Sequence, residues 1–385
     1  METCSFCGKR YEQYDLLEGV EGGICPTCFN IIKNMENPFE QPEEERVKVN
    51  FKETINILTP SEIKQGLDEY VAGQEDAKRT LSMETYLHLK YGGNEEFYRK
   101  KNNICLIGPS GSGKTYLVET LAKMLEVPFI IEDATTLSKT GYVGNSVSSM
   151  FERLYEKAGG DIDKAERGII FIDEIDKISS RYNIGTGGSD VGTTAIQQEL
   201  LKALEGGTYE VSGNQLIGGK GVKINSHNIL FIAGGAFVGL DEQRKRKVNK
   251  QGKIGFASKE ENEVEVSSKI QPDDLIEYGL IPELVGRLTL IESLHMLEKE
   301  HIKEILTTSK NSVLKSYQSL FQSEGIELVF TDAILEMMTE RIQKGKIGIR
   351  GVNSLLAKYL NNQLYDRLNT GDKSPLEIQE NLLSV

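Results

Sequence analysis

Short apolar runs alternate with helix-like segments through the middle of the chain. Each run has the length and apolar composition of a buried strand in a parallel sheet. The runs are Ile104–Ile107, Phe129–Ile131, Ile169–Ile172, Ile229–Ile232 and Leu288–Ile291. Between the first two, Leu117, Leu121 and Leu125 lie on one face of the helical segment Tyr116–Glu126. This alternation predicts an α/β domain whose parallel sheet is covered by helices on both faces.

The flanking regions have a different character. Residues 1–36 hold four of the chain's five cysteines, whereas residues 37–55 are acidic, contain proline and lack apolar periodicity. Through residues 300–365, Leu, Ile and Met recur at helical spacing. We therefore predict a cysteine-rich domain over 1–36, a flexible acidic linker over 37–55, a large α/β domain over 56–298 and a small, mainly helical domain over 299–385.

Acidic residues outnumber basic ones, 58 against 45, which gives a formal net charge of −13. Nucleic-acid binding needs concentrated Lys and Arg, so we expect no nucleic-acid partner. We interpret the basic run Arg244–Lys247 as a solvated loop rather than as a nucleic-acid contact. No segment approaches the roughly 18 consecutive apolar residues of a membrane span, and Met1–Cys4 does not begin an apolar signal core. We therefore expect a cytoplasmic protein that does not bind membranes.

A glycine-rich loop follows the first apolar run and precedes the helical segment. It matches the pattern G-x-x-x-x-G-K-[ST] in the strand–loop–helix setting that gives the pattern its meaning. The residues of the motif are Gly108, Pro109, Ser110, Gly111, Ser112, Gly113, Lys114 and Thr115. Glycines let backbone N–H groups turn toward a phosphate chain, Lys114 would reach the β- and γ-phosphates, and Thr115 would help to hold Mg²⁺. We predict an ATP site with Mg²⁺; the alternative is a glycine-rich turn that binds nothing.

Two acids end the third apolar run. Asp173 and Glu174 follow Ile169–Ile172 at the carboxyl end of a predicted strand, which is the end that faces the nucleotide. Asp173 would support Mg²⁺, and Glu174 would orient and activate the attacking water. The structural alternative is a strand followed by a capped helix that begins within Asp173–Lys177. Together with the phosphate loop, the two acids favour the catalytic interpretation.

Positive charge is also needed at the γ-phosphate in the transition state. Arg287 follows Ile281–Gly286 just before the last apolar run, and Arg350 lies within Gly348–Gly351 of the helical C-terminal region. Charge alone identifies neither residue, because each has the alternative of being an ordinary surface arginine.

Four cysteines near the N-terminus have the spacing of a four-thiolate zinc site. They form the pairs Cys4-x₂-Cys7 and Cys25-x₂-Cys28. So short a segment buries too little apolar surface to fold alone, so bound Zn²⁺ would supply its folding free energy. Four thiolates leave no open coordination position, so the zinc would be structural; the alternative is four unrelated thiols. We interpret Cys105, within an apolar run, as a small buried hydrophobic residue.

Together these motifs resemble the ClpX family of AAA+ unfoldases, the partners of the ClpP peptidase. Besides the cysteine pairs and the phosphate loop, the shared motifs are Tyr70–Gln74, Asp133–Leu137, Gly141–Gly144, Ile172–Lys177, Gly234–Phe237 and Asp274–Glu283. The resemblance runs from Cys4 to about residue 365. The related HslU proteins share the core motifs but differ at the N-terminus. The resemblance implies an AAA+ P-loop domain with a parallel sheet, a small mainly helical C-terminal domain and a treble-clef-like N-terminal zinc-binding domain.

The resemblance also implies an assembly and roles for single residues. It implies a homohexameric ring with ATP at the subunit interfaces. Tyr70 and Val71 match the segment that packs near the adenine. Arg287 matches the finger that reaches the neighbouring subunit's nucleotide, and Arg350 matches the sensor from the same subunit's small domain.

Two further segments match parts of the family that handle polypeptide. Tyr142 and Val143 match the central pore loop, where an aromatic and an aliphatic side chain grip an unfolded chain. Without the resemblance, Tyr142 would be interpreted as an ordinary loop aromatic. Ile254, Gly255 and Phe256, set in a polar stretch, match the loop that docks into ClpP. The alternative for this loop is packing against its own domain.

Three segments depart from the family pattern. Asn145-Ser146 replaces an acidic pair in the pore loop, and Ser189–Thr194 replaces a Gly-Glu-Gly-type pattern. The Arg-Lys-His triplet expected within 206–226 is absent, and Lys220 and Lys223 are not assigned its role. The departures point to altered substrate choice in a chain whose motor residues are intact.

We therefore predict an ATP-dependent unfoldase that recognises unfolded or tagged proteins, directly or through adaptors, and feeds them to a ClpP-type peptidase. Two other hypotheses stay open. The first is a stand-alone ATP-dependent remodeller of protein complexes without coupled proteolysis. The second is a non-enzymatic zinc-binding adaptor whose nucleotide site only maintains its shape.

Overall fold

The computed structural model describes residues 2–4, 10–11, 17–19, 22–26, 57–92, 101–137, 146–180, 191–211, 221–251, 269–344 and 349–378. The chain divides into two compact units, Met1–Asn56 and Ile57–Val385. The first unit contains two short antiparallel strand pairs. They are β1 (Glu2–Thr3) with β2 (Arg10–Tyr11), and β3 (Leu17–Gly19) with β4 (Gly22–Ile24).

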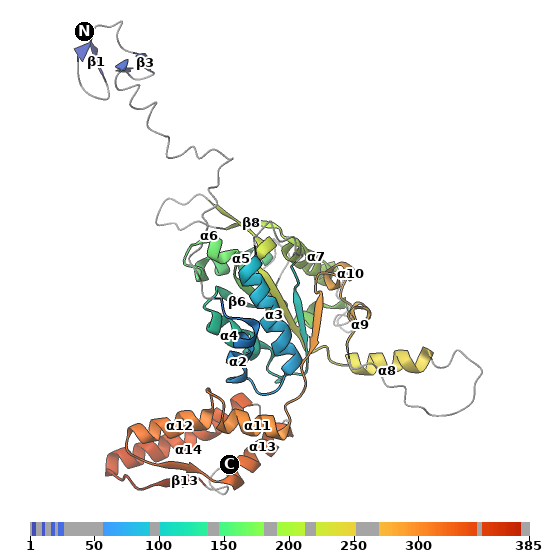
Figure 1. Cartoon of the computed structure of the whole chain (residues 1–385), viewed down its shortest axis with the longest axis vertical. Coiled ribbons are helices and arrows are strands. Elements are labelled where there is room, and N and C mark those ends of the chain that lie inside the picture. The colour runs from blue at the N-terminus through green and yellow to red at the C-terminus, as the bar shows by residue number, and fades with distance from the viewer. Residues whose placement is uncertain are drawn as a thin grey trace. The chain divides into compact units, whose positions relative to one another are not determined.

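The second unit contains a five-stranded parallel sheet with strand order β11-β5-β10-β7-β6 (Figure 1). The strands are β5 (Ile104–Ile107), β6 (Phe129–Asp133), β7 (Ile169–Asp173), β10 (Leu230–Gly235) and β11 (Leu290–Ser293). Each predicted apolar run overlaps one of them, which confirms the parallel α/β sheet. The largest extension is at β10, which continues beyond Ile232 because Ala233–Gly235 pair with Cys105–Ile107 of β5.

Helices and a hairpin surround this sheet. The helices are α2 (Pro60–Asp68), α3 (Glu75–Tyr91), α4 (Lys114–Leu125), α5 (Val147–Lys157), α6 (Ile162–Ala165), α7 (Val191–Glu205), α8 (Leu240–Gln251), α9 (Pro272–Tyr278) and α10 (Pro282–Val285). Short 3₁₀ turns are η2 (Ala134–Thr136), η3 (Ile175–Ile178) and η6 (Ser226–Asn228), and β8 (Thr208–Val211) pairs with β9 (Val222–Asn225) in an antiparallel hairpin. The predicted helix Tyr116–Glu126 corresponds to α4, which begins earlier because Gly113 is its N-cap residue.

Alternate residues of the central strands enter two separate cores, one on each face of the sheet. Ile104 and Leu106 of β5 belong to a core that includes residues of α2, α3 and α4. Cys105 and Ile107 belong to the other core, with residues of α5, α7, α9 and α10. Figure 1 shows α2, α3 and α4 together on one side of the sheet. Helices therefore cover both faces of the sheet, as predicted, so the candidate functional residues are to be sought at the ends of the strands.

The C-terminal part of the unit has a core of its own. Its elements are α11 (Lys299–Thr307), α12 (Val313–Ser323), β12 (Leu328–Phe330), α13 (Asp332–Gln343), α14 (Ile349–Thr370) and β13 (Leu376–Ile378). β12 and β13 pair in parallel, and buried residues such as Phe321, Ile334 and Leu356 form a cluster apart from the two sheet cores. The small, mainly helical C-terminal domain is confirmed. Of the helices that the structure describes, none combines the length and apolar character needed to cross a membrane.

The interpretation of Arg244–Lys247 as a solvated loop is wrong. The run lies in α8, where Arg244 is buried and its Nε is 3.0 Å from Asp274 Oδ2 of α9. Lys247 also pairs with Glu277 of α9, at 2.6 Å. Carboxylates on α9 satisfy part of this basic run, so it belongs to the packing between α8 and α9.

Candidate nucleotide site

The phosphate loop leaves the sheet at the carboxyl end of β5 and ends at the first turn of α4. Gly111 and Gly113 have φ angles of +84° and +93°, and a Cβ atom at either position would meet nothing within 4 Å. Glycine is therefore required at both positions for the left-handed backbone and not for space. This backbone lets successive N–H groups face a bound anion at the positive end of α4.

Gly108 has a different role, because it is a packing residue. A Cβ atom there would lie 2.5 Å from the carbonyl oxygen of Leu294 and 2.9 Å from the Leu294 Cβ. The loop therefore begins in direct contact with the segment that follows β11. Any side chain at 108 would have to displace that segment.

Lys114 is buried at the start of α4. Its Nζ donates to the carbonyl oxygens of Gly108 at 2.6 Å and Pro109 at 3.1 Å. Burial lowers the pKa of Lys114, although the nearby carboxylates of Asp173, Asp176 and Glu174 act in the opposite direction. A phosphate would give this buried ammonium a full negative charge to pair with, which the two carbonyls do not.

Thr115 and Asp173 bring two hard oxygen ligands together. The Thr115 Oγ1 donates to Asp173 Oδ2 at 2.7 Å, although the residues are 58 positions apart in the chain. Asp173 is the last residue of β7, and its Oδ1 accepts the backbone N–H of Glu174 at 2.9 Å. A hydroxyl and a carboxylate beside a phosphate loop fit Mg²⁺, which prefers oxygen ligands and binds with substrate phosphates.

Glu174 lies at the carboxyl end of β7 in a left-handed backbone conformation, with φ 55° and ψ 34°. It is the N-cap residue of η3, but its side chain makes no capping hydrogen bond. A helical turn does follow the strand, as in the structural alternative, but the exposed Glu174 carboxylate does not cap it. A non-glycine residue held in this conformation is a feature that clusters at functional sites.

Asp176 is a structural acid that the sequence analysis did not assign. It is fully buried, and it accepts the backbone N–H groups of Ala236 at 3.1 Å and Phe237 at 3.3 Å. These contacts join the end of β7 to the end of β10 and hold the strand end that carries Asp173. The only available signal was its place in the motif Ile172–Lys177.

Arg287 lies at the opposite end of the sheet from the phosphate loop. It precedes β11, which runs parallel to β5, and its carbonyl oxygen accepts from Asn103 Nδ2 at 3.0 Å just before β5 begins. Its Nε and Nη2 donate to Glu205 Oε1 at 3.0 and 2.7 Å. The sheet thus separates Arg287 from the Lys114 of its own chain, so Arg287 does not reach the phosphate loop of its own chain and its role stays a prediction.

Tyr70 and Val71 form the turn between α2 and α3. Lys78, which is 2% exposed, pairs with Asp68 and donates to the Val71 carbonyl oxygen at 3.2 Å, so the buried ammonium holds this turn in place. Lys310 of the C-terminal domain also contacts the turn, with its Nζ 5.6 Å from the centre of the Tyr70 ring. The segment expected near the adenine therefore lies between the sheet domain and the C-terminal domain.

Several predicted site residues lie outside the described part of the chain. These are Cys7, Cys28, Tyr142, Val143, Ile254, Gly255 and Phe256. Arg350 is in the first turn of α14, but its side chain is not among those described. The roles of all these residues stay predictions.

Two cysteines of the predicted zinc site are described. Cys4 directly follows β1 and Cys25 directly follows β4, and both are buried. The Cys25 backbone N–H donates to the Cys4 Sγ at 3.3 Å. A sulfur that accepts an N–H bond, in a segment with a second buried sulfur, fits the chemistry of zinc thiolates. Among the described side chains alone, no group of three or more metal-binding residues occurs.

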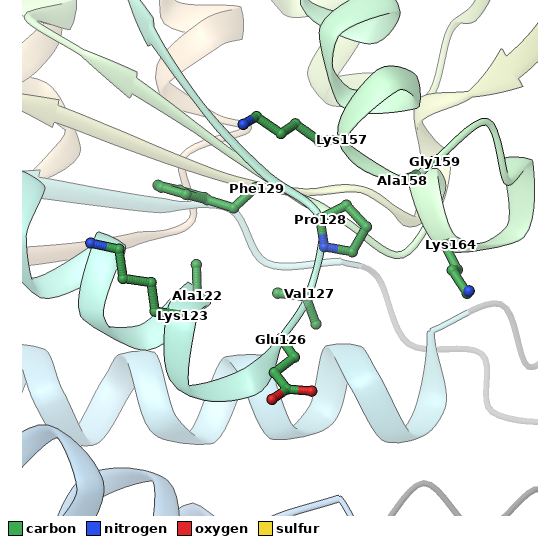
Figure 2. A pocket seen from close by; sticks show the side chains of 10 residues that line it. All are labelled: Ala122, Lys123, Glu126, Val127, Pro128, Phe129, Lys157, Ala158, Gly159 and Lys164. Atoms are coloured by element: carbon green, nitrogen blue, oxygen red, sulfur yellow. The ribbon is translucent and has the colours of Figure 1, made fainter.

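A pocket of about 590 Å³ lies elsewhere on the same unit. Figure 2 shows the side chains that line it. Three lysines, Lys123, Lys157 and Lys164, lie among its lining residues. Pro128 and Phe129, which also line it, are at the start of β6. The pocket therefore lies at the amino ends of the strands and is separate from the phosphate loop.

Two protein families match the chain. The AAA domain (Cdc48 subfamily) matches residues 99–291, and the C-terminal D2-small domain of ClpB protein matches residues 297–378. Full-length relatives match as well. The ATP-dependent Clp protease ATP-binding subunit ClpX of Azotobacter vinelandii is 38% identical over 381 residues, covering 94% of this chain and 86% of the relative. The subunit of the same name from Bacteroides thetaiotaomicron is 36% identical over 380 residues, covering 95% of this chain and 91% of the relative.

Proposed function

Since the chain belongs to the ClpX family and is an AAA+ ATPase, we propose that it is an ATP-dependent unfoldase that delivers polypeptide to a ClpP-type peptidase. The relatives are named as ATP-binding subunits of the Clp protease. The observation that carries the ATP-hydrolysing part of the proposal is the 2.7 Å contact between Thr115 Oγ1 and Asp173 Oδ2, with Glu174 next in the chain. This contact joins the phosphate loop to the strand end that carries the hydrolytic acids.

Each of the described side chains at the site is assigned a separate role in ATP hydrolysis. The loop N–H groups and Lys114 bind the phosphates, while Thr115 and Asp173 hold Mg²⁺. Glu174 orients the attacking water and accepts its proton. Its backbone is held by the N–H bond to Asp173 and by η3, so the carboxylate is positioned from a rigid strand end.

The remaining positive charge would come from two arginines. Arg287 lies at the far end of the sheet, so we propose that it serves the nucleotide of the next subunit in a homohexameric ring. Arg350 is assigned to the nucleotide of its own subunit. Glu205 holds Arg287 in the isolated chain at 2.7 Å, and this ion pair would be exchanged for a phosphate contact on assembly.

Polypeptide handling is assigned to two loops. We propose that Tyr142 and Val143 grip an unfolded substrate, and that Ile254–Phe256 dock into the peptidase. The bond from Arg244 of α8 to the Lys269 carbonyl oxygen, at 2.8 Å, fixes residue 269, where the described chain resumes after this segment, against the first half of α8.

The same proposal includes the domain bounds 1–36, 37–55, 56–298 and 299–385. The compact units divide at residues 56 and 57, and the two family matches leave a gap between 291 and 297, close to the proposed bound at 298. Zn²⁺ would be held by Cys4, Cys7, Cys25 and Cys28, where it would supply folding free energy and no catalysis. A cytoplasmic location is part of this proposal.

The deciding experiment is degradation of an unfolded reporter protein by the full chain with a ClpP-type peptidase. We expect degradation to require ATP, the chain and the peptidase together. Phe256→Ala should abolish degradation and leave ATP hydrolysis unchanged, whereas Tyr365→Ala, at a 68% exposed aromatic residue on α14, should change neither.

Two other results would replace the proposal. ATP-dependent remodelling of a complex without degradation, in the presence of the peptidase, would identify a stand-alone remodeller. A chain that binds zinc but does not turn over ATP would be an adaptor.

A further inference from the structure

Gln74 occupies an unusual position between α2 and α3. It is the N-cap residue of α3 but has left-handed backbone angles, φ 58° and ψ 40°, and its side chain makes no capping hydrogen bond. Gly73 before it also has a positive φ, of 67°. Two consecutive left-handed residues turn the Gln74 side chain away from α3, so its amide is available for contacts elsewhere.

The Gln74 amide joins two distant backbone segments. Its Nε2 donates to the carbonyl oxygens of His295 at 2.8 Å and Ser112 at 3.2 Å, and its Oε1 accepts the His295 N–H at 3.1 Å. The pair of bonds to His295 has the form of a strand pairing, with a side-chain amide in place of a peptide group. Ser112 belongs to the phosphate loop, so one planar group connects that loop to His295.

His295 lies in the connection between the two domains, after β11 and before α11. The residue before it, Leu294, donates its N–H to the Ile107 carbonyl oxygen at 2.6 Å. A Cβ atom on Gly108 would lie only 2.5 Å from the Leu294 carbonyl oxygen. The interdomain connection therefore packs against the start of the phosphate loop at Gly108. The Gln74 amide links the same connection to a later residue of the loop, Ser112.

The C-terminal domain makes further contacts on the same side. Lys310 pairs with Glu69 at 2.5 Å, and Asn311 Nδ2 donates to the Tyr116 hydroxyl at 3.1 Å. These two contacts are side chain to side chain on the surface, where such pairs contribute little to stability. Two more go to the backbone of the turn, from the Lys310 N–H to the Glu69 carbonyl oxygen at 3.0 Å and from Ser309 Oγ to the Tyr70 carbonyl oxygen at 3.3 Å. Among the described contacts between the turn at 69–74 and the interdomain connection, the Gln74 amide alone also reaches the phosphate loop.

We propose that Gln74 is a positioning residue that couples the phosphate loop to the interdomain connection, so that nucleotide binding at the loop is transmitted to the C-terminal domain. The inference rests on the proposed ATPase site. A phosphate would draw the Lys114 ammonium from the Gly108 and Pro109 carbonyls and order the loop, including the Ser112 carbonyl. Through the Gln74 amide, an ordered Ser112 carbonyl restrains the His295 backbone. Loss of the amide breaks this connection without removing a phosphate ligand.

Hydrogen–deuterium exchange of the full chain tests the coupling directly, because the His295 N–H is one of the three bonded groups. The probe is a non-hydrolysable ATP analogue with Mg²⁺, and the peptides of interest cover residues 290–298. In the unmutated protein we expect the analogue to slow exchange there by about fivefold, the scale of one hydrogen bond.

Gln74→Met keeps the shape and the unbranched side chain at this left-handed position but removes all three hydrogen bonds. We expect exchange at 290–298 to become independent of the analogue, while the analogue's affinity changes by less than about threefold. Gln74→Glu keeps an acceptor for the His295 N–H but loses the donor to both the Ser112 and the His295 carbonyl oxygens, which the carboxylate would face without a proton to donate. It should therefore lose the response to the analogue as Gln74→Met does. Gln65→Met, on the exposed face of α2, should behave as the unmutated protein.

An unchanged response to the analogue in Gln74→Met would overturn the coupling. So would an unmutated protein that binds the analogue with no change in exchange at 290–298. Failure of the unmutated chain to bind the analogue would instead overturn the proposed ATPase site itself, and the coupling with it. Binding is measured separately by titration, so the two failures are distinguished.

Discussion

Lys114 and Lys101 lie at opposite ends of the same sheet, and burial lowers the pKa of both. At the carboxyl ends of the strands, Lys114 lies near Asp173, Asp176 and Glu174. At the amino ends, Lys101 donates to the Ser226 carbonyl oxygen at 3.0 Å and lies 4.8 Å from the centre of the Phe231 ring. One lysine faces a group of carboxylates beside an anion-binding loop, and the other, which is half-buried, contacts a neutral carbonyl oxygen and an aromatic ring.

The difference between the two lysines shows how a functional site can be distinguished from a charged side chain that is merely buried. A lowered pKa occurs at both ends of the sheet, so it identifies neither as functional. The carboxyl ends also combine a left-handed acidic residue, a hydroxyl–carboxylate pair and a helix N-terminus within one loop system. At the amino ends, Arg287 pairs with Glu205 and Lys101 donates to the Ser226 carbonyl oxygen, and these two contacts share no group. We therefore identify the carboxyl ends as the candidate nucleotide site because several different kinds of polar group lie together there, and not because a lysine is buried.

The largest expected effect belongs to the one residue at the amino ends that is assigned to chemistry. Arg287→Ala should lower ATP hydrolysis by about 10³-fold while changing nucleotide affinity little, because the charge is needed in the transition state. Steady-state hydrolysis and nucleotide titration of the assembled protein measure the two quantities.

Glu205→Ala is the matched control for Arg287→Ala, because it removes the same ion pair and keeps the arginine. It should retain hydrolysis within about twofold, since exposed ion pairs contribute little to stability. Equal losses in the two variants would mean that Arg287 has only a structural role. Mixed rings of Arg287→Ala and Glu174→Gln subunits should regain part of the activity, because some interfaces then contain both residues.

At the carboxyl ends, Glu174→Gln should lower the rate of hydrolysis by about 10²- to 10³-fold, because the amide cannot accept a proton from water. Nucleotide affinity should stay within a few-fold of the unmutated value. Glu242→Gln, at an exposed acid on α8, is the control and should leave the rate unchanged. An unaltered rate in Glu174→Gln would contradict the assignment of the water-activating residue.

Substitutions of Lys114 and Lys101 test the comparison between the two ends of the sheet. Lys114→Met should weaken binding of Mg-ATP by about 100-fold, the scale of a lost charge-assisted contact to phosphate. Lys101→Met should leave that affinity unchanged. Isothermal titration with a non-hydrolysable analogue measures both, and a similar loss in the two variants would refute the distinction between the two ends of the sheet.

Lys101→Met should instead alter the pH dependence of stability. Burial lowers the pKa of Lys101 from 10.5 to about 7, so protonation favours the unfolded chain between these values. The stability of the unmutated protein should therefore fall as pH decreases from about 10.5 to about 7. Removing the ammonium should stabilise the protein near pH 6, where the charged form opposes folding most, less the lost Ser226 bond, and should have no such effect above the ordinary pKa.

Thermal unfolding followed by circular dichroism at pH 6 and pH 10 measures the Lys101 effect. Lys245→Met, at an exposed lysine, is the control and should show no such dependence on pH. A Lys101→Met protein that is less stable at pH 6 would show that the Ser226 and Phe231 contacts outweigh the burial of the charge.

The sequence predicted the strands of the sheet and the phosphate loop, because short runs of neighbouring residues specify both. Short apolar runs such as Ile104–Ile107 became strands because their residues alternate between two buried faces, and the glycines of the phosphate loop are where left-handed angles are needed. The basic run Arg244–Lys247 was misinterpreted because its partners, Asp274 and Glu277, are distant in the chain. A charge pattern alone does not reveal whether a neighbouring helix brings carboxylates to it.

The candidate site shows the same limit. The motifs predicted Lys114, Thr115, Asp173 and Glu174, because each belongs to a recognisable local pattern. The Gln74 amide received no role, since its partners lie 38 and 221 residues away and no pattern connects them. Long-range hydrogen bonds to backbone atoms leave no signature in one sequence, because any residue at 112 or 295 offers the same carbonyl.

The left-handed backbone at Glu174 has an evolutionary consequence. Glycine or asparagine would hold φ 55° with less strain, so a substitution that destroys the acid would also relieve the backbone. Drift without selection for hydrolysis would therefore run toward loss of this carboxylate, and toward a more stable but inactive protein. Glutamate at this position is therefore held at a cost in backbone strain that glycine would not incur.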